Sequence, residues 1–251
     1  MTPEQAAAAG RPIAVELGEA FSLSPAARRQ ARLLGISGWA FYVTARAGAL
    51  GAVPAETAAA CLGFVAPDAV AEGWDAATGV IDPRAVAAVN LAECCRWGDE
   101  RLGGLPGVAR LADLLHRTVT AAEAGALPLF AAWRGMPVPA DTPGARAAAG
   151  LHLLRELYLG AYLLAVRASG MTPLEATVAG TEGEAGAMAA GWPPPYPPVG
   201  PLVRRRLWAE AATDRMVSSA YRALRPAERV ELVDLLTAAQ RHLRDPLPDP
   251  G

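Results

Sequence analysis

The chain has 251 residues, of which 52% are hydrophobic, and this is enough for one large core or two small ones. All 23 basic residues are arginine, and the formal net charge is −2. The absence of lysine excludes a lysine Schiff base, and with it ordinary pyridoxal phosphate chemistry, as well as a Walker phosphate loop.

The cellular compartment is expected to be the cytoplasm. The first residues lack the basic segment and apolar core of a signal peptide, and no apolar run of about 18 residues is free of charge, so we expect no membrane partner. The three cysteines fit a reducing environment and show no metal or redox spacing. The tail from Asp245 reads D-P-L-P-D-P-G and is predicted to be disordered.

Helix-start signals recur along the chain, most often as a polar capping residue followed by proline, as in Ser24-Pro25 and Asp82-Pro83. Strand patterns of period two are scarce, so the predicted fold class is all-α. The expected helices cover residues 25–34, 37–47, 54–62, 67–77, 83–101, 107–124, 128–134, 143–169, 173–180, 202–223 and 226–243.

One long helix over 143–169 is expected to organise the rest. It begins at Thr142-Pro143 and is apolar nearly all round, which predicts burial. Helix-turn-helix or winged-helix-like modules would pack around it. The expected units are an N-terminal helical module over 1–104, a central module over 105–191, and a proline linker, helical pair and tail over 192–251, or else one compact domain.

Two short segments, 54–62 and 67–77, have the spacing of a helix-turn-helix motif with a small residue in the turn. A second candidate is the end of the long helix followed by 173–180. Proteins that read the major groove carry basic or amide side chains on the second helix. Here neither second helix carries a base, and 67–77 is acidic, so DNA binding is expected to be weak or absent.

The segments G-W-A-F-Y-V-T-A-R-A-G-A-L-G-A-V-P-A-E-T at 38–57 and L-L-R-E-L-Y-L-G-A-Y-L-L-A-V-R-A-S-G-M-T-P-L-E-A at 153–176 resemble the SalK-like helix-turn-helix-fold proteins of actinobacteria. The run L-R-P-A-E-R-V-E-L-V-D-L-L at 224–236 resembles the C-terminal end of the same family. The resemblance covers the chain from about Phe21. It implies a fold related to winged-helix regulators and no particular chemistry.

The long helix departs from that family after its Arg-Glu pair. The family tends to have a run like R-E-H-R-G-D-G-H, whereas this chain has R-E-L-Y-L-G-A-Y. Leu157 and Tyr162 stand where histidines are usual, and Tyr158, Leu159 and Gly160 replace polar or small residues. If those histidines serve a site, this chain has exchanged it for an apolar, aromatic one.

The long helix also carries the candidate site. Arg155 and Glu156 lie among apolar residues, and buried charges require partners or a ligand. Tyr158, Leu159 and Tyr162 share a helical face with Arg155, whereas Glu156 lies at the edge of that face.

A second group of candidates, Trp39, Tyr42 and Arg46, lies on the helix at 37–47. If this helix crosses the long one, the two groups line one cavity, largely apolar with a few convergent polar groups, as in small-molecule sites. The alternative is an ordinary aromatic core with arginines reaching to the surface.

The histidines give no metal signature. His116, His152 and His242 share no helical face, so we expect no metal and no cofactor. His152 lies one turn before Glu156, so the two could hydrogen-bond, either as a simple helix-face pair or as a general base held by a carboxylate.

The sequence therefore predicts a pocket for a hydrophobic, ring-bearing molecule on a helix-turn-helix-derived scaffold. Within that class we favour a cofactor-independent tailoring enzyme of bacterial secondary metabolism, of cyclase or isomerase type. Arg46 and Arg155 would hold a carboxylate or polarise a carbonyl. Glu156, with its pKa raised by burial, would be the acid–base group, and Tyr158 and Tyr162 would contact the ligand.

Two other classes stay open. One is an effector-binding transcription regulator of winged-helix type. The other is an interaction protein that works through the polyproline segment at 191–201. A homodimer is compatible with each of the three.

Overall fold

The computed structural model of the protein describes residues 1–244, which form thirteen α-helices and three short 3-10 helices, with no strand among them. The all-α prediction is confirmed, while the prediction for the tail from Asp245 falls outside the described residues. The α-helices are α1 (Pro3–Ala20), α2 (Pro25–Leu33), α3 (Gly38–Ala47), α4 (Ala55–Leu62), α5 (Pro67–Thr78), α6 (Pro83–Leu102), α7 (Val108–Ala121), α8 (Pro128–Arg134), α9 (Pro143–Ala168), α10 (Pro173–Val178), α11 (Gly183–Ala189), α12 (Val203–Tyr221) and α13 (Pro226–Arg244).

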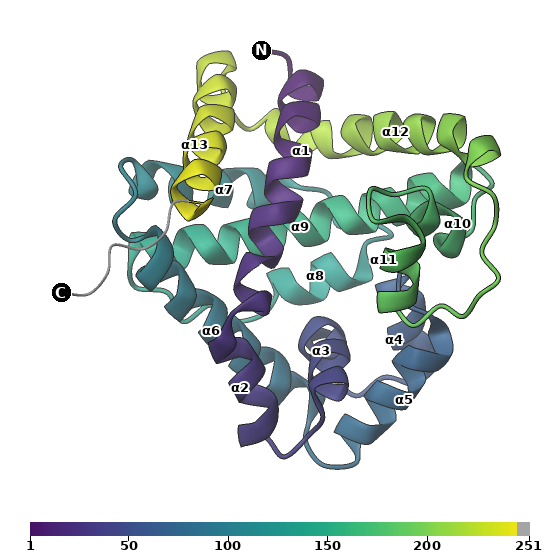
Figure 1. The fold of residues 1–251 in the computed structure, drawn as a ribbon. Helices are drawn as coiled ribbons and strands as arrows, with labels where there is room; N and C mark the ends of the chain where they lie inside the picture. The colour runs from purple at the N-terminus through teal and green to yellow at the C-terminus, as the bar shows by residue number, and fades with distance from the viewer. Residues whose placement is uncertain (245–251) are drawn as a thin grey trace.

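Helix α9 runs through the middle of the molecule, and α1, α6, α7, α8 and α12 all pack directly on it (Figure 1). It is the one described helix that is long and apolar enough to cross a membrane by length and composition. However, 67% of its apolar window is buried inside the protein, which is the pattern of a core helix. The predicted burial of the long helix is confirmed.

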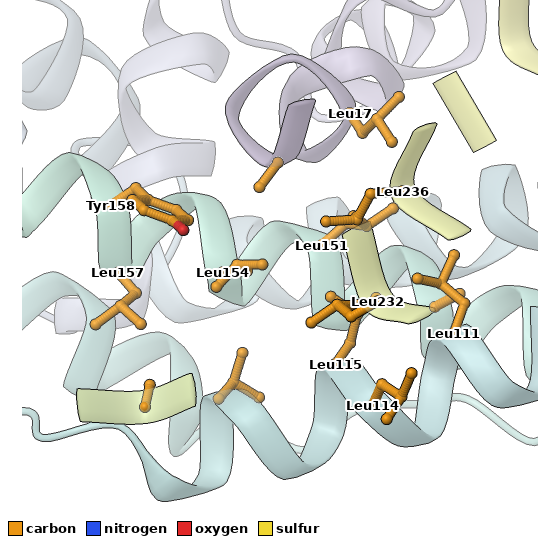
Figure 2. Packing of buried hydrophobic residues seen from close by; sticks show 14 of the residues in the cluster. Leu17, Leu111, Leu114, Leu115, Leu151, Leu154, Leu157, Tyr158, Leu232 and Leu236 are labelled. Atoms are coloured by element: carbon orange, nitrogen blue, oxygen red, sulfur yellow. The ribbon is translucent and has the colours of Figure 1, made fainter. Parts of the chain in front are cut away.

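The main core lies on one side of α9, where leucines from four helices meet (Figure 2). Helix α1 contributes Leu17, α7 contributes Leu111 and Leu115, and α13 contributes Leu232 and Leu236. The N-terminal helix therefore shares its core with the C-terminal pair. Residues from both ends of the sequence thus pack into a single hydrophobic core.

Helices α6 and α9 cross through a pair of facing glycines. A Cβ atom added to Gly98 would lie 2.5 Å from the carbonyl oxygen of Gly144, and one added to Gly144 would lie 2.6 Å from the carbonyl oxygen of Gly98. The two backbones are thus in direct contact, which only glycine permits.

Sequence analysis missed two helices, α1 and α11. Helix α1 begins with the same signal that was recognised elsewhere, because Thr2 caps Pro3 and Gln5 completes a capping box. Gly10 and Pro12 inside it hide the periodicity. Helix α11 is short and glycine-rich, and is held by tertiary contacts rather than by propensity.

The predicted helix-turn-helix is present as α4 and α5, joined at Gly63, which has a φ of +64°. Helix α3 packs against α5 to complete a three-helix unit. The turn of this motif is covered by the segment after α11. There the Ala66 amide donates to the Ala190 carbonyl (2.9 Å), and the Trp192 indole N–H donates to the Phe64 carbonyl (3.1 Å).

Candidate functional site

Two cavities meet where α1, α3 and α9 come together. The first, which we call the Tyr162 cavity, has a volume of about 530 Å³ and lies between α9, α3 and the segment from α10 to Ala190. The second, the His152 cavity, has a volume of about 390 Å³ and lies beneath α2 and α3. Four side chains border both cavities: Glu19, Tyr42, Arg46 and Arg155.

The structure brings six of the eight predicted site residues to the Tyr162 cavity. They are Tyr42, Arg46, Arg155, Tyr158, Leu159 and Tyr162. The other two, Trp39 and Glu156, do not border it. Trp39 stacks on Tyr42, with ring centroids 5.4 Å apart, and its indole N–H donates to the Ala69 carbonyl at 2.7 Å. It therefore packs against a residue that borders the cavity without bordering the cavity itself.

The two tyrosines of α9 have different environments. Tyr158 is 1% exposed, and its hydroxyl bonds to the Ala7 carbonyl and to the Tyr221 hydroxyl, both at 2.8 Å. This hydroxyl is therefore committed to the core. Tyr162 is half-buried and stacks on Phe64, with ring centroids 5.4 Å apart. Of the two rings, Tyr162 is the one that could also contact a ligand.

Arg155 and Glu156 are 5% and 2% exposed, as predicted. They pair directly, with 2.6 Å between Nη1 and Oε1, and Arg155 Nη2 lies 3.0 Å from the Glu19 carboxylate. The expected upward shift of the Glu156 pKa is wrong. Burial does favour the neutral acid, but Arg155, Arg46 and His152 outweigh it and lower the pKa, so Glu156 is a carboxylate at neutral pH.

Arg46 differs from Arg155 because no carboxylate of the described residues lies within ion-pair distance of it. Its guanidinium donates to the Tyr42 hydroxyl at 3.0 Å and lies over the Tyr42 ring, 5.6 Å from the centroid. Burial alone would lower the pKa of Arg46. Tyr42, Glu156 and Glu19 raise it by more than burial lowers it, so the guanidinium stays protonated. Arg46 is therefore a cation that a ligand could approach.

His152 corrects a second expectation. It does not bond to Glu156, and neither of its ring nitrogens has a hydrogen-bond partner within residues 1–244. The ring is 3% exposed and packs edge-on against Phe21 and Trp133, with centroids 5.7 and 4.5 Å away. Burial lowers the pKa of His152 to about 4, so the imidazole is neutral at physiological pH.

Four buried polar atoms without partners gather around the junction of the two cavities. They are Arg46 Nε, Arg155 Nε, His152 Nδ1 and His152 Nε2, and the fifth such atom among residues 1–244 is Thr44 Oγ1. Buried polar groups are normally hydrogen-bonded, so such a concentration calls for a physical explanation.

Glu19, which borders both cavities, was not predicted from the sequence. It lies on α1, and that helix was not predicted although its capping signal was readable.

Metal binding has no support in the geometry. Among residues 1–244 no group of three or more His, Cys, Asp or Glu side chains is placed to hold a metal ion. Cys94 and Cys95 are buried, and burial raises both of their pKa values, so the thiols are unreactive at neutral pH.

A family model described as a helix-turn-helix family matches residues 11–195, which is more than half of the chain. The chain belongs to this helix-turn-helix family. No curated protein and no solved structure matches it. The matched region includes α4, α5 and all the residues that line the His152 cavity. It also includes most of the lining of the Tyr162 cavity, whereas Arg206 and Glu210 of that lining lie on α12, beyond the match.

The second helix of the helix-turn-helix, α5, has an acidic exposed face and a covered N-terminal end. The exposed face of α5 carries Asp68, Glu72 and Asp75, which would repel phosphate. The N-terminal end of α5 is also approached by Gly191, where an added Cβ would lie 2.6 Å from the Ala69 Cβ. Charge and steric cover thus act against insertion of α5 into a groove.

Proposed function

We propose that the protein binds a hydrophobic, ring-bearing small molecule in the Tyr162 cavity, with Arg46 holding its polar group. The supporting observation is that Arg46 has no carboxylate partner among the described residues, yet borders the same cavity as Leu159 and Tyr162. An apolar wall with a half-buried cation is the usual composition of a small-molecule site. Arg155 has less to offer a ligand because two carboxylates already neutralise it.

As part of the same proposal, the activity is a cofactor-independent cyclisation or isomerisation in bacterial secondary metabolism, carried out in the cytoplasm by a SalK-like protein. Such a step moves a proton between positions of one molecule and needs no redox partner. Arg46 would polarise a carbonyl. The acid–base role expected of Glu156 does not fit this cavity, because Glu156 does not border it and is paired with Arg155. Native mass spectrometry of the protein purified from its own host tests whether a molecule is bound.

Tyr162→Ala is expected to weaken binding of the molecule so identified by about 1–3 kcal/mol, because a stacking surface is lost and a space is left. Tyr162→Phe should cost less. Isothermal titration calorimetry measures both, and Tyr196→Ala, which removes a tyrosine away from both cavities, is the matched control. Unchanged affinity in a folded Tyr162→Ala protein would mean that this ring belongs only to the core.

The second candidate function is an effector-binding transcription regulator, and the α4–α5 motif itself is the observation that favours it. In that case the small molecule would be an effector rather than a substrate. The acidic face of α5 and its covered turn oppose this reading.

DNA binding is therefore expected to be weak and independent of sequence. A mobility-shift titration at physiological salt measures it, with genomic fragments from around the protein's own gene and a scrambled fragment as the control. A sub-micromolar complex that forms only with one sequence would establish the regulator instead.

A further inference from the structure

We propose that the His152 cavity is a second binding site, and that it takes the ring of a neutral phenol whose hydroxyl is recognised by His152 together with a guanidinium N–H of Arg46 or Arg155. This goes beyond the function proposed above, because recognition here does not use the Tyr162 wall. Either cavity could be occupied while the other is empty.

The walls of the His152 cavity are suited to an aromatic ring. Phe21 and Phe41 are nearly fully buried, and Ala31 and Ala45 extend the apolar surface that they form. The volume of about 390 Å³ falls within the range of ligand pockets, roughly 300–1,000 Å³. Apolar surface of this kind favours a ring over a sugar or a phosphate.

His152 supplies the polar contact of the cavity. A neutral imidazole has one nitrogen that donates and one that accepts, and neither is used within residues 1–244. The edge-on contacts with Phe21 and Trp133 hold the ring in place. A buried group fixed in this way loses its hydrogen bonds to water on folding, and a ligand can restore them.

The guanidinium groups supply the complementary donors. Arg46 Nε and Arg155 Nε are both buried without partners in the described chain, and both residues border the His152 cavity. A hydroxyl can donate to the accepting imidazole nitrogen while its oxygen accepts from one of these N–H groups. One ligand atom thereby satisfies the unpaired acceptor and one of the unpaired donors.

The alternatives satisfy the site less well. A carboxylate has no hydrogen to donate to the accepting nitrogen of His152. The charged residues that line the cavity are Arg28, Arg46 and Arg155 against Glu19, so charge alone does not disfavour an anion. The discrimination against a carboxylate rests on the hydrogen that the accepting nitrogen of His152 requires. A ring with no hydroxyl leaves every unpaired group as it was.

Three probes that differ in one substituent separate these cases: p-cresol, toluene and 4-methylbenzoate. Calorimetric titration of the full chain near pH 7.5 should give p-cresol an affinity at least about tenfold higher than either of the others, a difference of about 1.4 kcal/mol. His152→Phe should bring p-cresol to the level of toluene, and Tyr162→Ala should leave it unchanged. Preferred binding of 4-methylbenzoate would overturn the proposal.

A second measurement does not depend on the folding of a His152 variant. In the wild-type protein, p-cresol should shift the imidazole nitrogen resonances of His152 in long-range 1H–15N spectra, and His116→Gln and His242→Gln assign the remaining signals. Unshifted His152 resonances at saturating p-cresol would overturn the proposal. Equal loss of p-cresol binding in Tyr162→Ala would do so too, and would place the ring in the Tyr162 cavity instead, in support of the proposed function.

Discussion

Gly98→Ala is expected to destabilise the protein by about 2–3 kcal/mol, although alanine is the better helix former by about 1 kcal/mol. The added Cβ would meet the Gly144 carbonyl oxygen at 2.5 Å and the Ala148 Cβ at 2.6 Å. These atoms belong to the backbone and to the base of a side chain, so α6 and α9 must move apart. Urea denaturation followed by circular dichroism measures the free energy of unfolding.

Gly38→Ala is the matched control for that experiment. It also lies in a helix, but a Cβ added there meets nothing within 4 Å, so its effect should be neutral or slightly stabilising. The opposite signs of the two changes in the free energy of unfolding separate the effect of helix propensity from that of the contact between α6 and α9. A Gly98→Ala protein as stable as wild type would show that the α6–α9 crossing is looser than described.

Acidification is expected to remove about 3 kcal/mol of stability through His152. The folded protein lowers the His152 pKa from 6.5 to about 4, mainly by burial and in part through Arg155 and Arg46, while Glu156 acts in the opposite direction. Between these two values the unfolded chain binds a proton that the folded protein excludes. The contribution of His152 to the free energy of unfolding is therefore fully present above pH 6.5 and is lost as the pH falls to about 4.

The free energy of unfolding, measured from pH 7.5 to 4 in wild type and in His152→Phe, isolates this contribution as the difference between the two curves. His116→Gln, which removes an exposed histidine, is the control. If His152→Phe does not fold, an NMR titration of His152 in the wild-type protein reports the same quantity. A midpoint near 6.5 would contradict the expectation.

The same residue explains why the two cavities differ in chemistry. Arg46 and Arg155 stand between them and offer donors to both, but His152 borders only the His152 cavity, and Tyr162 only the Tyr162 cavity. A ligand in the Tyr162 cavity therefore meets a cation beside an aromatic ring. A ligand in the His152 cavity meets a neutral imidazole that can both donate and accept.

Local features of the fold could be read directly from the residues. Capping residues followed by proline located the starts of α2, α6, α9 and α10, because an N-cap oxygen and a residue without N–H both suit the first turn. The composition of α9 predicted its burial, and helical spacing placed Arg155, Tyr158, Leu159 and Tyr162 on one face. The turn at Gly63 was likewise readable from spacing and residue type.

The hydrogen-bond and ion-pair partners of the buried polar groups depend on long-range packing. The pairing of Arg155 with Glu19 depends on how α1 crosses α9, and that contact joins residues more than a hundred positions apart. The direction of the Glu156 pKa followed from those neighbours rather than from burial alone. His152 lost its expected bond for the same reason, because long-range packing against Phe21 and Trp133 fixes its ring, and helical spacing carries no information about such contacts.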